Sequence, residues 1–95
     1  MDIQTALRQP DVAIIDVREP FDFNDHHVEG ALNIPLQSIP NRLDEFRQMS
    51  GPIVLYCRSG SRSGMATNYL KSNGFSQVYN GGSVGQMEMF LLPHF

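Results

Sequence analysis

Apolar runs along the chain predict the strands of a central sheet. Residues 12–15 and 53–56 are continuous apolar runs rich in β-branched side chains. This pattern is typical of strands buried on both faces of a parallel sheet. Shorter apolar stretches at residues 31–34 and 78–79 predict two further strands. The chain therefore contains at least four strand candidates, separated by longer mixed segments.

The segments between these strands are expected to be helical. Ile39, Leu43 and Phe46 are spaced by four and then three residues, which places them on one face of a helix, and Pro40 suits its first turn. Further helical segments are expected at residues 3–8, at 21–27 (as a short helix or turn), from 62 or 63 to the stop signal Asn73-Gly74, and at 84–92 after a turn at Gly81-Gly82.

The alternation of strands and helices predicts the fold class. It favours an α/β fold with a mostly parallel central sheet of about four to five strands and helices on both faces. The chain has 95 residues, of which 41% are hydrophobic and 18% charged, so residues 1–95 are expected to form one domain with its own core.

Charge and hydropathy exclude several classes of function. The formal net charge is −3 and the basic residues form no stripe, which argues against a nucleic-acid binder. The apolar runs are far shorter than the ~20 residues that span a bilayer. The first residues lack the pattern of a signal peptide, and a lone cysteine suits a reducing compartment. A cytoplasmic location is therefore expected.

Cys57 is the strongest candidate for chemistry. It is the single cysteine, and it lies where a predicted strand ends and a predicted helix begins. The short loop after it, with Arg58 and Arg62, brings backbone N–H groups, a helix N-terminus and two guanidinium groups toward one point. These effects lower the pKa of a thiol and attract an anionic substrate. The alternative is that Cys57 is a small buried hydrophobic residue that ends a strand.

Loop length separates two classes of cysteine enzyme. Tyrosine phosphatases carry Arg six positions after the nucleophilic cysteine, whereas Arg62 follows Cys57 by five and Ser63 occupies the sixth position. A shorter ring of N–H donors suits a single sulfur atom better than a phosphoryl group. Arsenate reductase chemistry would need a second cysteine, which the chain lacks.

Three segments resemble the single-domain rhodaneses, or thiosulfate sulfurtransferases. Residues 15–23 read IDVREPFDF, residues 27–35 read HVEGALNIP, and residues 56–63 read YCRSGSRS. The first two resemble signatures of that family, and the third resembles its six-residue active-site loop. The resemblance extends over nearly the whole chain in the right order.

The resemblance implies a rhodanese-like domain and a mechanism in which Cys57 attacks the outer sulfur of thiosulfate and carries it as a persulfide. An acceptor such as cyanide or a thiol then takes the sulfur. No metal and no organic cofactor are implied. The residues expected to bind the substrate are Arg58, Ser59, Gly60, Ser61, Arg62 and Ser63. Asp16 and Arg18 are expected to form a scaffold for the loop.

The resemblance leaves several possibilities open. The sulfur donor is either a small molecule or a protein persulfide, and the domain is expected to be a monomer or a weak dimer. A non-catalytic rhodanese-like binding module is the main alternative function, although such modules often lack the loop cysteine. His27 belongs to a family signature and is expected to be structural rather than catalytic.

Two departures from the family pattern concern the ends of the domain. The family commonly has Trp after Gly81-Gly82, but this chain has none, so looser packing of the last helix is expected. Few residues precede the first strand, so a leading family strand is expected to be missing or very short. The apolar residues near the end, from Met87 to Phe95, are expected to pack on the sheet, or else to form a patch for a partner.

Overall fold

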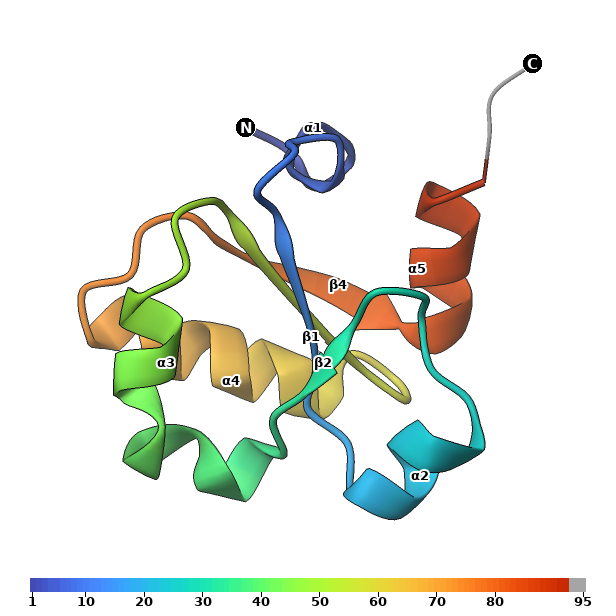
Figure 1. The fold of residues 1–95 in the computed structure, drawn as a ribbon, viewed down its shortest axis with the longest axis horizontal. Helices are drawn as coiled ribbons and strands as arrows, with labels where there is room; N and C mark the ends of the chain where they lie inside the picture. Colours follow the sequence, from blue (N-terminus) through green and yellow to red (C-terminus); the bar gives the residue numbers. More distant parts are fainter. Residues whose placement is uncertain (93–95) are drawn as a thin grey trace.

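The apolar runs form a four-stranded parallel sheet in the computed structural model, which describes residues 1–92 (Figure 1). The strand order is β2-β1-β3-β4 and every neighbouring pair is parallel. The strands are β1 (Ala13–Asp16), β2 (Leu32–Asn33), β3 (Ile53–Cys57) and β4 (Val78–Ser83). The predicted fold class is confirmed, with β3 at the centre beside β1.

Helices cover both faces of this sheet. Figure 1 shows α3 and α4 on one side and α1 and α5 on the other, as the sequence pattern predicts. The helices are α1 (Ile3–Leu7), α2 (Pro20–Asp25), the 3-10 helix η1 (Leu36–Asn41), α3 (Leu43–Arg47), α4 (Ser61–Ser72) and α5 (Val84–Phe90). No helix among residues 1–92 is both long and apolar enough to cross a bilayer.

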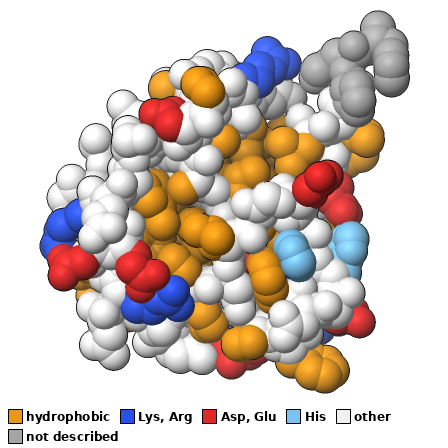
Figure 2. All heavy atoms as spheres, viewed as in Figure 1, with side chains coloured by type: hydrophobic (Ala, Val, Ile, Leu, Met, Phe, Trp, Pro, Cys, Tyr) orange, Lys and Arg blue, Asp and Glu red, His pale blue; other side chains and the backbone are white. Residues whose placement is uncertain are grey.

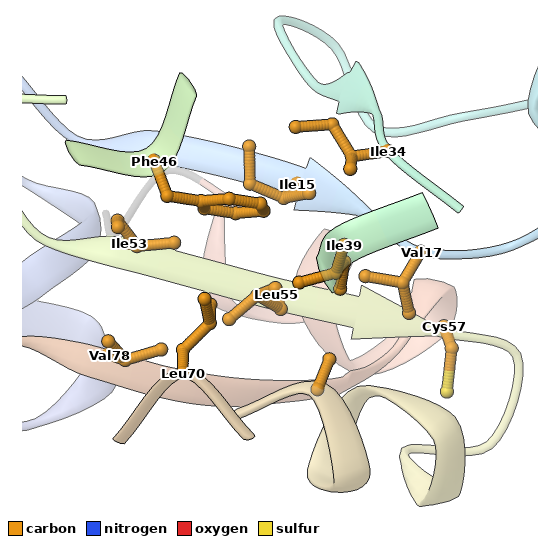
Figure 3. Packing of buried hydrophobic residues seen from close by; sticks show 11 residues of the cluster. Ile15, Val17, Ile34, Ile39, Phe46, Ile53, Leu55, Cys57, Leu70 and Val78 are labelled. Carbon is orange, nitrogen blue, oxygen red and sulfur yellow. The ribbon is translucent and has the colours of Figure 1, made fainter. Parts of the chain in front are cut away.

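Side chains of β3 alternate between two hydrophobic clusters. Ile53, Leu55 and Cys57 belong to the cluster under α3 and α4 (Figure 3). Val54 and Tyr56 belong to the cluster under α1 and α5. All five are buried. The catalytic candidate and its neighbour Tyr56 therefore face opposite sides of the sheet.

The helix predicted around Ile39, Leu43 and Phe46 is divided into two. The 3-10 helix η1 contains Pro40, and Arg42 leaves helical geometry with φ −125° and ψ 21° before α3 begins. The Arg42 amide donates to the Ile39 carbonyl, a bond across three residues that closes η1 at this point. Ile39 and Phe46 are nevertheless buried in the same cluster, so the prediction of a shared face holds although that of one helix is wrong.

The turn predicted at Gly81-Gly82 is a β-bulge inside β4. Leu55 pairs with Asn80 and Tyr56 with Gly82, so Gly81 is the extra residue. Gly82 has φ +87°, a conformation that favours glycine. A side chain at Gly81 would collide with Met87 of α5. The glycine pair therefore lets the strand bend and α5 approach it closely.

The last helix is anchored without a tryptophan. Met87 is completely buried, and Val84 and Phe90 pack against the same cluster. A capping box begins the helix: the Ser83 hydroxyl accepts from the Gln86 amide, and the Gln86 side chain accepts from the Ser83 amide. These contacts attach α5 to the sheet, and the looser packing expected from the missing tryptophan stays a prediction. Phe95 lies outside the described residues.

The surface keeps some apolar side chains exposed. Figure 2 shows hydrophobic side chains gathered near the middle of one face, with charged ones mainly toward its margin. Met89 and Leu92 at the end of the described chain are also exposed. Among residues 1–92 no strand precedes β1, so β2 and β4 form the two edges of the sheet. Partner binding stays a prediction.

Candidate active site

Cys57 is the last residue of β3, and α4 begins four residues later at Ser61. Figure 3 shows its side chain at the end of the strand, next to the first turn of this helix. Gly60 closes the loop with φ +94°, a conformation that favours glycine. A side chain at Gly60 would also lie 3.2 Å from the Gly82 Cα. The loop can therefore turn this sharply only because position 60 is glycine.

Three hydrogen bonds converge on the Cys57 sulfur. The Gly60 amide donates at 3.0 Å, the Ser63 amide at 3.4 Å and the Ser63 hydroxyl at 3.3 Å. Burial of the sulfur raises the pKa of the thiol, but donation by Ser63 and by the Ser59 and Gly60 amides outweighs it. The pKa of Cys57 therefore lies below its ordinary value.

The lowered pKa predicts how Cys57 reacts with pH. Alkylation by iodoacetamide follows the thiolate, so its pH midpoint in the native protein should lie below that of the same chain unfolded in urea. Mass spectrometry measures the rate of alkylation at each pH. The midpoint of this curve does not depend on how accessible the sulfur is, because accessibility scales the rate at every pH. A native midpoint at or above the unfolded one would contradict the arrangement described.

The sulfur is covered in the structure. Cys57 has no exposed surface, whereas Arg58, Ser59, Ser61 and Arg62 around it are exposed. The sulfur is therefore covered by its surroundings in this conformation. A hollow of about 330 Å³ adjoins the loop on the side of α1 and α5, and its lining includes Ser59, Gly60, Asn80, Gly82 and Gln86. A similar hollow at the other end of β3 has no connection to Cys57.

Arg58 and Arg62 form a basic rim around the loop. Both are exposed, and the ion pairs described within residues 1–92 involve neither of them. Neither donates a hydrogen bond to the sulfur, which is served by backbone amides and Ser63. Their guanidinium groups are therefore available to an anion that approaches the loop.

Asp16 and Arg18 lie at the end of β1, on the other face of the sheet from Cys57. Arg18 Nη2 is 2.8 Å from Asp16 Oδ2, and the Asp16 side chain has no exposed surface. The guanidinium also lies over the Tyr56 ring, at 5.9 Å from its centroid. Tyr56 adjoins Cys57 in the chain, and its hydroxyl accepts from the Val28 amide. This pair therefore braces the strand end that carries Cys57, and the hydrogen bonds described for its side chains involve no residue of the loop.

His27 is held by its neighbours. Its ring stacks on Phe23 with 3.7 Å between centroids, and Nδ1 lies 2.7 Å from the Phe23 carbonyl oxygen. These contacts fit the structural role expected for it. Among residues 1–92, no group of His, Cys, Asp and Glu side chains is arranged to bind a metal ion.

Asn80 belongs to the site, and sequence reasoning missed it. Its side chain joins β4 to the loop, with Nδ2 donating to the Gly60 carbonyl at 3.0 Å and Oδ1 lying 2.7 Å from the Ser63 hydroxyl oxygen, as a second acceptor for its one proton beside the Cys57 sulfur. In the sequence, Asn80 is marked only as a polar residue just before Gly81-Gly82. That position does not predict that its side chain lies near Cys57.

Comparisons with known proteins decide the family. The model of the "Rhodanese-like domain" family matches residues 2–85, which include Cys57, Asn80 and the β4 bulge. The chain belongs to the rhodanese-like domain family. The loop that follows Cys57 therefore lies within the part of the chain that matches this family.

Two curated relatives and one solved structure show how far the likeness extends. The chain is 45% identical over 67 residues to the uncharacterized protein YqhL of Bacillus subtilis and spans 52% of its length. It is 34% identical over 76 residues to the thiosulfate sulfurtransferase PspE of Escherichia coli, covering 79% of this chain and 73% of that one. A structure described as "rhodanese with anions from E. coli" superposes with a TM-score of 0.72 at 33% identity, covering 79% of this chain and 89% of that one.

Proposed function

We propose that this rhodanese-like domain is a thiosulfate sulfurtransferase that carries sulfur on Cys57. The observation that carries the proposal is the set of donors from Gly60 and Ser63 converging on a single sulfur. Such donors stabilise a thiolate, and the same kind of site stabilises the negative charge of a persulfide. The likeness to the thiosulfate sulfurtransferase PspE supports the choice of donor.

The proposed reaction has two half-reactions. The Cys57 thiolate attacks the outer sulfur of thiosulfate, a new S–S bond forms to Cys57, and sulfite leaves with the electron pair of the broken bond. A thiophilic acceptor such as cyanide or a thiol then attacks the outer sulfur of the persulfide. That step breaks the bond to Cys57 and regenerates its thiolate. No net oxidation or reduction of the protein occurs.

Intact-mass spectrometry tests this proposal directly. Incubation with thiosulfate should add one sulfur atom to the protein, and cyanide should remove it. Cys57→Ser should show no gain. Absence of any gain in the wild type would contradict thiosulfate as donor; an aryl phosphate and a protein persulfide would then be tried in turn. An inert Cys57 that also resists alkylation would favour the non-catalytic binding module.

Arg62→Ala is expected to weaken the use of thiosulfate. A guanidinium at the loop rim can hold the sulfonate end of the donor, so its loss should raise the apparent KM by about tenfold, with a smaller effect on kcat. Steady-state kinetics with cyanide as acceptor measure both constants. Arg47→Ala, which removes an equal charge on α3, is the matched control. An unchanged KM for Arg62→Ala would remove Arg62 from the site.

Partners and location follow from the same chemistry. A small-molecule donor, or a protein persulfide that presents its sulfur at the loop, would supply Cys57 by the same chemistry. A free thiolate functions in a reducing compartment such as the cytoplasm. We propose that the domain acts as a monomer or weak dimer.

A further inference from the structure

The orientation of the Asn80 side chain is determined by its backbone partners. Oδ1 lies 3.0 Å from the Gly82 amide nitrogen, and Nδ2 lies 3.0 Å from the Gly60 carbonyl oxygen. A backbone N–H can only donate and a carbonyl can only accept. If the amide oxygen and nitrogen were exchanged, the Asn80 NH₂ group would face the Gly82 N–H, donor against donor. The Asn80 oxygen would face the Gly60 carbonyl, acceptor against acceptor. Oδ1 therefore faces Ser63.

This orientation gives the Ser63 hydroxyl two competing acceptors. Ser63 Oγ lies 2.7 Å from Asn80 Oδ1 and 3.3 Å from Cys57 Sγ. The hydroxyl has one proton, and an amide oxygen can only accept. When the proton points to Asn80, Oγ presents a lone pair to the sulfur, which suits a thiol. When the proton points to the sulfur, it stabilises a thiolate. The 2.7 Å contact between Ser63 Oγ and Asn80 Oδ1 then has no proton between its two oxygens.

We propose that Asn80 is a positioning residue for the Ser63 hydroxyl. The hydroxyl donates its hydrogen bond to Asn80 Oδ1 while Cys57 is a thiol, and turns to donate it to the sulfur when the thiolate forms. In the first state the Cys57 S–H donates to Ser63 Oγ. On ionisation the S–H bond breaks, its proton goes to solvent, the electron pair stays on sulfur, and the Ser63 hydroxyl rotates without breaking its O–H bond. This inference rests on the proposed use of Cys57 as a nucleophile.

The Ser63 hydroxyl is the hydrogen-bond partner of the sulfur that can change its orientation when Cys57 ionises. Arg58 and Arg62 are exposed on the loop and α4, and the Asp16–Arg18 pair and Tyr56 lie toward the other face of the sheet. Among the described residues, the side chain that hydrogen-bonds to Sγ is Ser63. The backbone donors to Sγ cannot turn away in the same manner, because the loop fixes them.

A double-mutant cycle on the pH midpoint of Cys57 alkylation tests the proposal. Asn80→Leu fills similar space but offers no acceptor, so Ser63 can then donate only to sulfur. Ser63→Ala should raise the midpoint in both backgrounds, and by about half a pH unit more in the Asn80→Leu background than in the wild type. Asn80 lies exposed on an edge strand, so water can serve the freed Gly60 carbonyl and the fold should persist.

The cycle separates competition from simple support of the loop. Loosening of the loop by Asn80→Leu is present in both proteins that carry this substitution and cancels in the comparison. Equal effects of Ser63→Ala in the two backgrounds, or a larger effect with Asn80 present, would overturn the proposal. Asn68→Leu, at an exposed position on α4, is the matched control. Because alkylation requires no sulfur donor, the result is independent of whether thiosulfate is used.

Infrared spectroscopy gives a second measurement that needs no change at Asn80. Cys57 is the only cysteine, so the single S–H stretching band belongs to it. At a pH where it is a thiol, the band should lie at lower frequency in the wild type than in Ser63→Ala, because S–H loses its acceptor in the variant. A band that does not move would overturn the assigned thiol state.

Discussion

Cys57→Ser is expected to lower the rate of sulfur transfer by about 10⁴-fold or more, since removal of a nucleophile of this kind abolishes nearly all covalent catalysis. The serine hydroxyl stays protonated near neutral pH and cannot hold a transferable sulfur as a persulfide. The exchanged side chain is close in size to the original, so the donors from Gly60 and Ser63 should stay in place. Thiocyanate production from thiosulfate and cyanide measures the loss.

Two controls make this result specific to the nucleophile. The circular dichroism spectrum and urea midpoint of Cys57→Ser should match those of the wild type closely, which shows that the loss is chemical. Ser76→Ala, at an exposed position outside the site, should retain full activity after the same purification. Turnover retained by Cys57→Ser would eliminate Cys57 as the sulfur carrier.

Arg18→Ala is expected to reduce the free energy of unfolding by about 3 kcal/mol, because it leaves a buried carboxylate without its charged partner. Asp16 has no exposed side-chain surface, and Arg18 is only 12% exposed. The guanidinium also donates to the His26 carbonyl at 2.6 Å, so its loss releases the segment after α2. In a domain of this size the melting temperature should fall by about 12–24 °C.

Urea unfolding of Arg18→Ala beside a matched variant measures the effect. Arg42→Ala removes a guanidinium whose partner, Glu45, is half exposed, and such pairs contribute only about 0–1 kcal/mol. A fall in the midpoint at unchanged slope reports stability alone. Equal losses for the two variants would show that burial of Asp16 adds nothing to its pairing with Arg18.

Local sequence patterns were enough to predict the sheet and the position of Cys57, the candidate nucleophile, at the end of a strand. Continuous apolar runs marked β1 and β3, because only strands covered on both faces keep such runs. The change from an apolar run to Arg, Ser and Gly after Cys57 marked the end of β3, where open α/β sheets bind ligands. These features are local in the chain, so they can be read without knowing its packing.

Local patterns failed where distant contacts or backbone geometry decide the outcome. The Gly81-Gly82 pair has the composition of a turn, but pairing with β3 makes it a bulge. The spacing of Ile39 and Phe46 marks a shared buried face correctly, whereas the break between η1 and α3 lies in the backbone of Arg42, which leaves helical geometry. Residue spacing predicts which side is buried more reliably than whether the backbone is continuous.

The arrangement of side chains within the site depends on the folded chain. Asp16 and Arg18 were expected to form a scaffold for the loop, and the sequence alone did not say from which side. The two-residue period of strands places them on the other face from Cys57. Asn80 reaches Ser63 across 17 residues of sequence because β4 lies next to β3 in the sheet. Residue identity is local, but the distance between side chains on different strands depends on register and on the face each one occupies, and both are established only when the strands pair.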